Sequence, residues 1–474
     1  MIGSWREKFC KASRANVALF TLAQVAGITK GHMATSRPAD LHKTVRRVWT
    51  DSRTCRRGDL FVALPGPRFD GRHFVRAARK KGAVAAVVHG QSIRDIDVPV
   101  IYVEDTLQAF QELAAAHRRR FRIPVVAVSG SNGKTTTKEM IGRVLSERFK
   151  TLVTEANYNN HIGVPQTLLR LTARHQAAVV EMGISGLGEM SRLCEIAAPT
   201  HGVLTNIGPT HLATLGTTQT VARAKGELVK SLPAGGTAIL NADDPYFKQL
   251  SSWTNGTVLS FGFSRRAKVR ALRVRSKNAL ASTVSVKLPG RRSFSINLHV
   301  AGRHNISNAL AAVAAGKALG VGVNKIQAGL ARYRAGAMRS EVLRRRGITI
   351  INDCYNANPS SVRAALEWLQ EMKGGGRSFA VLGEMLELGE REAEIHHELG
   401  QTVAAGADYL LTMGTLGADL AAGALAGGMS RNHVVLANKH EELGMRLRKL
   451  LRAGDVILLK GSRGAKMERV LEQL

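Results

Sequence analysis

The sequence has few cysteines, few aromatic residues and no long apolar run. Four cysteines are scattered over 474 residues, so neither a disulfide framework nor a cysteine metal site is indicated, and free thiols in a reducing cytoplasm are expected. They are Cys10, Cys55, Cys194 and Cys354. No apolar segment approaches the ~20 residues that span a membrane. Aromatic residues make up 5% of the chain, and no basic cluster is interleaved with them, so we expect no nucleic-acid partner.

Acidic residues are also scarce: 36 Asp and Glu stand against 68 Lys and Arg, which gives a formal net charge of +32. A field of that size favours anionic partners such as nucleotides, nucleic acids or acidic membrane surfaces. The arginines are spread along the chain, so a solvated basic surface is the simpler interpretation. A weak association with an anionic surface is the alternative.

The first 20 residues form a basic extension. Its basic residues are Arg6, Lys8, Lys11 and Arg14. Together with the fairly apolar stretch 15–28 they loosely imitate a secretory signal, but polar residues interrupt that stretch and no small-residue cleavage site follows. We expect instead a short strand and a helix capped by Thr21.

A phosphate-loop pattern lies at residues 125–145. The mostly β-branched run Val125–Ser129 predicts a strand, Gly130-Ser-Asn-Gly-Lys-Thr-Thr136 follows it, and apolar residues at helical spacing continue to Leu145. Glycines let backbone N–H groups point into such a loop, and the helix start adds partial positive charge. Lys134 would reach the β/γ-phosphates and Thr135 would hold Mg²⁺. Val128 stands where the longer Walker pattern has glycine.

Three further residues are metal-site candidates by their positions. Glu181 ends the buried-type strand 177–181, where a doubly wound sheet places ligand groups, and a solvated acid is the alternative. His211 follows the predicted strand 202–207, and a structural histidine is its alternative. Lys225 lies on or beside the inward stripe of a helix, where a lysine must snorkel, pair or change its charge.

The remaining pattern is strands alternating with helices, which predicts an α/β protein with parallel sheets. We predict three domains: a small N-terminal α/β domain at 21–122, a central P-loop ATPase domain at 123–335 and a C-terminal Rossmann-like domain at 336–474. Asn305 or Ser307 is expected to cap an alanine-rich helix. Asp353 ends a strand, a position suited to a ribose hydroxyl.

With these pieces in place the chain resembles the Mur ligase family over nearly everything after residue 20. The motifs that carry the resemblance are Asp51-Ser-Arg53, Gly130 to Thr136, Asn157 to Pro165, Glu181-Met-Gly183, Ala224-Lys-Gly-Glu227, Gly302-Arg-His-Asn305, Asp353 to Pro359, Leu382 to Gly389 and Lys460-Gly-Ser-Arg463. The Ala-Lys-Gly-Glu and Tyr-Asn-Ala-Asn-Pro strings point to the branch that adds a dipeptide.

The resemblance implies a monomeric ATP-dependent ligase that joins D-alanyl-D-alanine to UDP-N-acetylmuramoyl-tripeptide through an acyl phosphate. It implies ATP and two Mg²⁺ ions, with metal ligands from Thr135, Glu181, His211 and a carbamylated Lys225. Nucleotide contacts would come from Gly130, Ser131, Asn132, Gly133, Lys134, Thr136, Asn305, Asp353 and Arg339. Substrate contacts would come from Asp51, Ser52, Arg53, Asn159, Asn160, Asn356, Asn358, Lys460 and Arg463.

Three other hypotheses about the function remain open from the sequence. A related branch that adds a diamino acid is expected to carry Asn-Pro-Arg, whereas Asn358-Pro359 is followed here by Ser360. Charge alone suggests a nucleic-acid-binding NTPase. An inactive scaffold is disfavoured because Lys134, Glu181 and Lys225 are all present.

Overall fold

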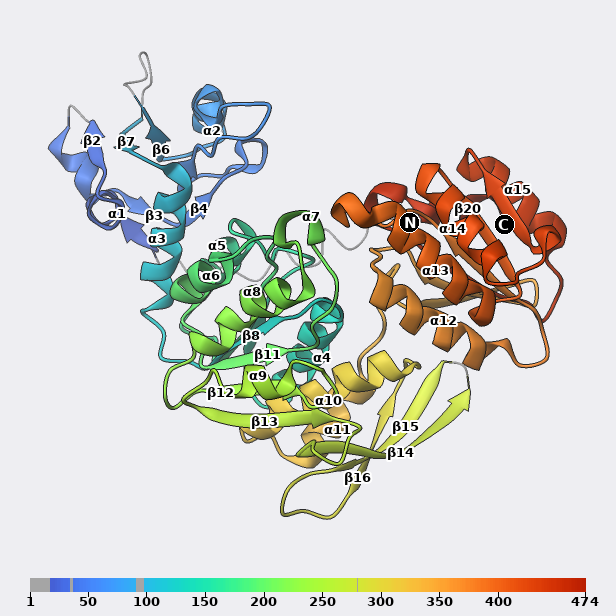
Figure 1. Cartoon of the computed structure of the whole chain (residues 1–474). Coiled ribbons are helices and arrows are strands. Elements are labelled where there is room, and N and C mark those ends of the chain that lie inside the picture. Colours follow the sequence, from blue (N-terminus) through green and yellow to red (C-terminus); the bar gives the residue numbers. More distant parts are fainter. Residues whose placement is uncertain (1–17, 35–36, 91–97, 279) are drawn as a thin grey trace. The chain divides into compact units, whose positions relative to one another are not determined.

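The computed structural model describes residues 18–34, 37–90, 98–278 and 280–474, and the chain divides into two compact units (Figure 1). The first runs to Arg122 and also takes in His161–Ala173; the second contains Ile123–Asn160 and Arg174–Leu474. Most of the predicted basic extension, residues 1–17, lies outside the described residues, and so does Cys10. Cys55, Cys194 and Cys354 are buried free thiols. No helix of the described residues is long and apolar enough to cross a membrane.

The first unit is built on a five-stranded sheet in the order β2-β7-β6-β5-β4, with β2 antiparallel and the rest parallel. Its elements are β1 (Phe20–Thr21), α1 (Leu22–Thr29), β2 (His32–Ala34), β3 (Thr44–Val45), β4 (Arg47–Trp49), β5 (Asp59–Val62), α2 (Val75–Lys80), β6 (Ala85–His89), β7 (Val100–Val103), α3 (Thr106–Arg118) and α5 (Gly163–Leu168). The predicted helix start is confirmed: the Thr21 hydroxyl accepts a hydrogen bond from Gln24 N at 3.2 Å, and the Gln24 side chain accepts one from Thr21 N at 3.0 Å.

Segment His161–Ala173 joins the first unit through side chains of α3. Gln111 Nε2 donates to the His161 carbonyl at 3.1 Å, and His117 Nε2 contacts the Leu171 carbonyl oxygen at 2.9 Å. His117 is buried, and burial lowers the pKa of its imidazole. These contacts join segments that are far apart in the sequence, and the predicted domain boundary at residue 122 does not anticipate them.

The second unit contains two sheets, and the larger has nine strands in the order β16-β15-β14-β13-β12-β11-β8-β10-β9. Strands β9 to β14 and β8 run parallel, whereas β14, β15 and β16 pair antiparallel. The strands are β8 (Val125–Ser129), β9 (Thr151–Val153), β10 (Ala177–Glu181), β11 (His201–Leu204), β12 (Thr237–Asn241), β13 (Thr257–Gly262), β14 (Val269–Asn278), β15 (Ala281–Lys287) and β16 (Phe294–Leu298).

Helices cover both faces of this sheet, as a doubly wound fold requires. They are α4 (Lys134–Ser146), α6 (Glu189–Ala197), α7 (Leu212–Leu215), α8 (Thr218–Lys230), α9 (Phe247–Ser251), α10 (Arg303–Ala318) and α11 (Val323–Ala331). The α4 residues Met140, Ile141 and Val144 pack with Val126 and Val128 and with α10 in one core, and each buried side chain of this size contributes about 1.5–3 kcal/mol. On the other face, Leu228 of α8 lies against Gly202 of β11.

The smaller sheet has the order β17-β18-β22-β19-β20-β21, parallel except for β17. Its elements are β17 (Glu341–Arg345), β18 (Ile348–Asp353), α12 (Pro359–Lys373), β19 (Ser378–Leu382), α13 (Glu392–Gly406), β20 (Tyr409–Met413), α14 (Thr415–Ala426), β21 (Val434–Ala437), α15 (His440–Leu450) and β22 (Val456–Lys460). The predicted α/β class with parallel sheets is confirmed.

Helices α13 and α14 cross so closely that glycine is required at the contact. A Cβ atom on Gly423 would lie 1.9 Å from the His397 carbonyl oxygen. We expect Gly423→Ala to lower the free energy of unfolding by about 1–3 kcal/mol, because backbone must shift to admit the methyl group. Denaturant unfolding measures this, with Gly375→Ala as the control, since no atom lies within 4 Å of a Cβ there. An equal effect of both substitutions would contradict the close crossing.

Candidate active site

The phosphate loop joins β8 to α4 with two glycines at positive φ. Gly130 has φ +142° and Gly133 has φ +77°, and side chains rarely adopt either conformation. A Cβ on Gly130 would lie 2.0 Å from Thr205 Oγ1, and one on Gly133 would lie 2.4 Å from Asn308 Oδ1. Space and backbone conformation therefore both require glycine at these two positions.

The segment after β11 holds the loop in place. Ser131 N donates to the Asn206 carbonyl at 2.9 Å, and the Ser131 hydroxyl accepts from Gly208 N at 2.9 Å. Asn132 N donates to Asn206 Oδ1 at 3.0 Å. The loop is thus preorganised by hydrogen bonds to a neighbouring strand end.

The Lys134 ammonium rests on the carbonyls of its own loop. Its Nζ donates to Gly130 O at 2.7 Å and to Ser131 O at 3.1 Å. Burial lowers the pKa of Lys134, the Glu181 carboxylate opposes that shift, and Arg339 adds to it. Burial raises the pKa of Tyr333, and the side chain of Thr136, two residues beyond Lys134 on α4, opposes that rise.

Glu181 is buried, with 1% of its surface exposed, so the alternative of a solvated acid is wrong. Its Oε1 accepts hydrogen bonds from Thr135 Oγ1 at 3.1 Å and from Asn159 Nδ2 at 2.7 Å. Its Oε2 is buried and has no hydrogen-bond partner. The carboxylate therefore joins the phosphate loop to the amide-rich loop and keeps one oxygen unsatisfied.

Lys138 was missed by sequence reasoning. It lies one turn beyond Lys134 on α4, and 1% of its surface is exposed. Its Nζ donates to the Ala156 carbonyl at 3.0 Å and lies 3.6 Å from Glu181 Oε2. The sequence did contain a signal for Lys138, because this lysine lies on the buried stripe of α4 and buried lysines are rare unless paired.

We expect Lys138→Met to lower the free energy of unfolding by about 3 kcal/mol, because it leaves a buried carboxylate without its cation. In a chain that already carries Glu181→Gln, Lys138→Met should lower the free energy of unfolding by only about 1 kcal/mol, because no buried carboxylate is then left without a cation. Denaturant unfolding of the four proteins in this cycle measures the coupling. Equal costs in both backgrounds would mean that Lys138 stabilises the fold independently of Glu181.

The charge of Lys134 acts on both His211 and Lys225, and the charge of Lys225 also acts on His211. His211 has a left-handed backbone (φ 55°), and its Nδ1 lies 2.7 Å from Glu387 Oε2. Burial and the charges of Lys225 and Lys134 lower the pKa of His211, and Glu387 opposes them. Glu387 was quoted within a motif but was given no role by the sequence.

Lys225 of α8 is completely buried, and its Nζ has no hydrogen-bond partner. Burial first and the Lys134 ammonium second lower the pKa of Lys225 well below its ordinary value, and Glu189 opposes them. Compared with an exposed lysine, the balance at this position is thus shifted toward the neutral amine. A buried amine without a partner is costly, and such perturbed groups are concentrated at functional sites.

Within the part of the chain that the structure describes, no group of three or more His, Cys, Asp or Glu side chains could hold a metal ion. The predicted set contains only Glu181 and His211 of those types; its other members are a hydroxyl and a lysine. It becomes rich in oxygen ligands only when Lys225 carries a carboxylate, which is the ligand type that Mg²⁺ prefers.

The start of α10 lies beside the end of β18. His304 Nε2 contacts Ser340 Oγ at 3.2 Å, and Ser340 N donates to Asp353 Oδ1 at 2.8 Å. The other oxygen of Asp353 accepts from Lys460 Nζ. Asn305 is buried here, but its Nδ2 donates to the Ala301 carbonyl at 2.8 Å. The prediction that Asn305 or Ser307 caps α10 is wrong: Gly302 holds that position without a side-chain hydrogen bond.

The candidate peptide contacts differ in how exposed they are. Asn358 is buried as the cap of α12, and its Nδ2 donates to Asn132 Oδ1 at 2.7 Å. Asn160 and Asn356 are exposed. Arg463 is exposed and pairs with Glu468 at 2.8 Å.

Arg339 lies next to Tyr355, with its guanidinium carbon 3.5 Å from the ring centroid. This stacking and the influence of Arg339 on the pKa of Lys134 place its charge near the phosphate loop.

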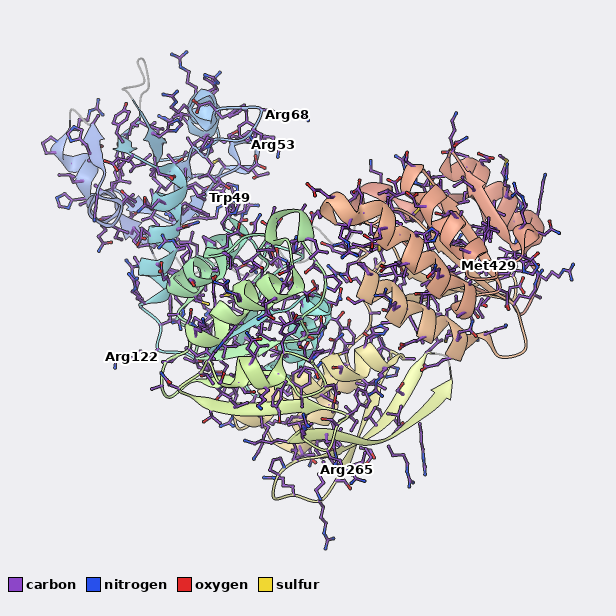
Figure 2. All side chains as sticks on the ribbon, viewed as in Figure 1. Trp49, Arg53, Arg68, Arg122, Arg265 and Met429 are labelled. Carbon is purple, nitrogen blue, oxygen red and sulfur yellow. The ribbon has the colours of Figure 1, made fainter. Side chains whose placement is uncertain are left out.

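The Asp51-Ser52-Arg53 loop belongs to the first unit, on which Figure 2 labels Arg53. Asp51 caps a short 3₁₀ turn, Ser52–Thr54, and pairs with the largely exposed Arg53 side chain at 2.9 Å. The hydrogen bonds from Arg53 lower the pKa of Asp51.

This fold and site define a phosphate-loop α/β protein with a buried carboxylate and two perturbed lysines at the loop. Three family models match the chain: "Mur ligase family, catalytic domain" at residues 44–118, "Mur ligase middle domain" at 128–316 and "Mur ligase, glutamate ligase domain" at 338–463. The chain belongs to the Mur ligase family, whose members are ATP-dependent ligases that form an amide bond.

Individual relatives match over nearly the full length. UDP-N-acetylmuramoyl-tripeptide--D-alanyl-D-alanine ligase of Bacillus subtilis is 36% identical over 458 residues, 96% of this chain and 98% of that one. The crystal structure of MurF from Acinetobacter baumannii is 31% identical with a TM-score of 0.88, covering 96% and 98%. MurF ligase from Thermotoga maritima in complex with ADP is 29% identical with a TM-score of 0.81, covering 90% and 97%.

Proposed function

We propose that the chain joins D-alanyl-D-alanine to UDP-N-acetylmuramoyl-tripeptide at the expense of ATP. The observation that carries this proposal is the 36% identity over 96% of the chain to an enzyme of that name, together with the intact phosphate loop and its buried charged residues. The three buried free thiols fit a reducing cytoplasm, and we propose a monomer that acts there without a nucleic-acid partner.

The nucleotide would bind on the phosphate loop and would also contact residues from the segment that forms the smaller sheet. Backbone N–H groups of residues 130–136 and the start of α4 suit the phosphates, and Lys134 would leave its own loop carbonyls to reach the β/γ-phosphates. Asp353 would bind the ribose, Asn305 the adenine and Arg339 the γ-phosphate. A relative from Thermotoga maritima that has been crystallised with ADP supports nucleotide binding at this fold.

The residues around Thr135 fit magnesium. Glu181 Oε2 and Lys225 Nζ are both buried without a hydrogen-bond partner, and such orphaned groups are rare in folded proteins. Thr135, Glu181, His211 and a carbamylated Lys225 would hold two Mg²⁺ ions, which would supply positive charge to the reacting phosphate and carboxylate.

Carbamylation is a simple addition at this lysine. The neutral amine of Lys225 attacks carbon dioxide, a nitrogen–carbon bond forms, and one proton is released, which leaves a carbamate. Burial already favours the neutral amine, since it lowers the pKa of Lys225 well below the ordinary value. The new negative charge would be stabilised by the Lys134 ammonium, whose charge acts on Lys225, and by the bound magnesium ions, which would offset the cost of burying the carbamate.

The chain's own residues then bind and orient the reactants. The terminal carboxylate of the tripeptide attacks the γ-phosphorus of ATP, which releases ADP and forms an acyl phosphate. The amine of the dipeptide attacks the acyl carbon, loses a proton, and phosphate leaves as the amide forms. Lys134 and Arg339 offset the repulsion between the anions, and a closed site protects the acyl phosphate from water.

Substrate contacts are proposed on both units. Asp51, Ser52 and Arg53 would bind the UDP part. Asn159, Asn160, Asn356 and Asn358 would bind the peptide, with Lys460 and Arg463 for carboxylate or phosphate groups. Asn159 holds Glu181 at 2.7 Å, so it would link peptide binding to the metal site.

Phosphate release tests the proposal. We expect turnover only when UDP-muramoyl-tripeptide, D-alanyl-D-alanine and Mg-ATP are all present. Steady turnover with UDP-muramoyl-dipeptide and a diamino acid would assign the chain to another branch of the family. Stimulation by polynucleotide, with no response to the muramoyl substrates, would overturn the ligase proposal in favour of an NTPase.

A further inference from the structure

The middle of the chain lacks acidic residues. No aspartate or glutamate occurs between Asp244 and Glu341, and within that interval lysine and arginine are concentrated around β14 and β15. These basic residues are Arg265, Arg266, Lys268, Arg270, Arg273, Arg275, Lys277, Lys287, Arg291 and Arg292. The excess charge of the chain is therefore partly collected on one structural element.

That element is the antiparallel edge of the nine-stranded sheet. One face of this edge contributes Ala271 of β14, Val284 and Val286 of β15, and Ile296 and Leu298 of β16 to the core that contains α10 and α11. Side chains alternate along a strand, so the intervening residues lie on the opposite face. The strand register places Arg273 beside Ser285 and Ser285 beside Ser295, and places Arg275 beside Thr283 and Thr283 beside Asn297.

This opposite face, which we call the basic face, is made of cations and small polar side chains. It comprises Arg270, Arg273, Arg275, Thr283, Ser285, Lys287, Ser295 and Asn297. Arg273, Arg275 and Lys287 are exposed, and in the described part of the chain none of them forms an ion pair. Arg265, labelled in Figure 2, precedes β14 in the same acid-free interval.

Aliphatic side chains are exposed on the same strand. Leu272 is 45% exposed, and Val274 is 41% exposed although its partner Val284 is fully buried. The outer ends of β14 and β15 extend past α10 and α11 (Figure 1), so the helices leave this part of the hairpin uncovered. Val274 pairs with Val284 and so lies on the core side of the sheet, opposite Arg273 and Arg275, and it does not form part of the basic face.

We propose that the basic face of β14–β16 docks on an anionic lipid surface. Arg273, Arg275 and Lys287 bind the phosphate headgroups. Charge complementarity favours this occupant, since each cation near an anionic leaflet adds to the attraction. The eight residues of the basic face include no aromatic side chain on which unpaired bases stack, which disfavours single-stranded nucleic acid.

Vesicle co-sedimentation of the full chain tests the proposal. We expect binding to vesicles of phosphatidylglycerol and phosphatidylcholine in low salt, none to pure phosphatidylcholine, and loss of binding near 1 M salt, where the Debye length falls to about 3 Å. Arg273→Glu/Arg275→Glu should lower the partition coefficient by about 30-fold or more, because two headgroup-binding cations are lost and reversed. Ligase activity in solution should be unchanged.

The matched control is Arg431→Glu/Lys439→Glu, which alters net charge equally at two exposed residues flanking β21. It should retain most of the binding. Equal loss in both variants would show that total charge alone drives association, and absence of vesicle binding in low salt would also overturn the proposal. Binding of a mixed-sequence oligonucleotide in preference to vesicles, abolished by the β14 variant, would assign the face to nucleic acid instead.

Discussion

Replacing Lys225 with methionine is expected to lower ligase turnover by about 10³-fold or more while the fold becomes at least as stable as that of the unaltered chain. The loss follows because a methionine cannot carry the proposed carbamate, so the site would lack that carboxylate ligand and the charge stabilisation that depends on it. The stability gain follows because the lysine amine is buried without a hydrogen-bond partner, which costs about 1–3 kcal/mol.

The same lysine predicts how stability depends on pH in buffer free of carbon dioxide. The folded pKa of Lys225 lies well below the ordinary value, so over the interval between that lowered pKa and about 10.4 the unfolded chain binds the extra proton. The free energy of unfolding should therefore rise with pH across this interval. Lys225→Met should lack that contribution.

Turnover assays, denaturant unfolding at several pH values and ¹³C NMR of protein equilibrated with labelled bicarbonate measure these effects. Lys230→Met on the same helix is the control, because Lys230 is exposed and packs over Trp253. Full activity of Lys225→Met, or a carbamate signal that persists in it, would rule out the proposed role of Lys225.

Replacing Lys134 with methionine is expected to lower kcat/KM for ATP by about 10²–10³-fold. This is the usual cost of removing one preorganised donor from a site where negative charge develops. Binding of ADP should weaken less, because in the proposed site Lys134 reaches the β/γ-phosphates and ADP lacks the γ-phosphate. Stability should change little, since two loop hydrogen bonds are lost but a buried ammonium is also removed.

Initial rates and ADP titrations separate the two effects. Lys317→Met is the control, because Lys317 is an exposed lysine in the last turn of α10. Equal losses for ATP and ADP would indicate that Lys134 shapes the loop and does not act on the γ-phosphate.

Local sequence patterns gave the element types and the positions of the strand-end residues. Residues 125–146 formed the expected strand, glycine loop and helix, because β-branched residues, glycines and helical apolar spacing each have a local physical cause. Glu181 and Asp353 were correctly placed at strand ends for the same reason. Glu181 ends a strand of the nine-stranded sheet and Asp353 ends a strand of the smaller sheet.

Contacts between distant segments were not predictable in this way. Nothing in the periodicity of α4 reveals that Lys138 reaches both Glu181 and the Ala156 carbonyl. The hydrogen bond from Asn358 to Asn132, 226 residues away, was likewise not anticipated. Asn305 was expected to cap α10 because its residue type suits that position, but Gly302 begins the helix.

The amino-acid sequence by itself determined the fold class, the phosphate loop and the family, because these depend on local conformational preferences and on the order of short motifs. Only the tertiary structure decided which charges are buried and which are satisfied. Burial depends on the packing of elements far apart in the chain, and a lysine or carboxylate acquires its chemistry from the low-dielectric surroundings and the partners that this packing provides.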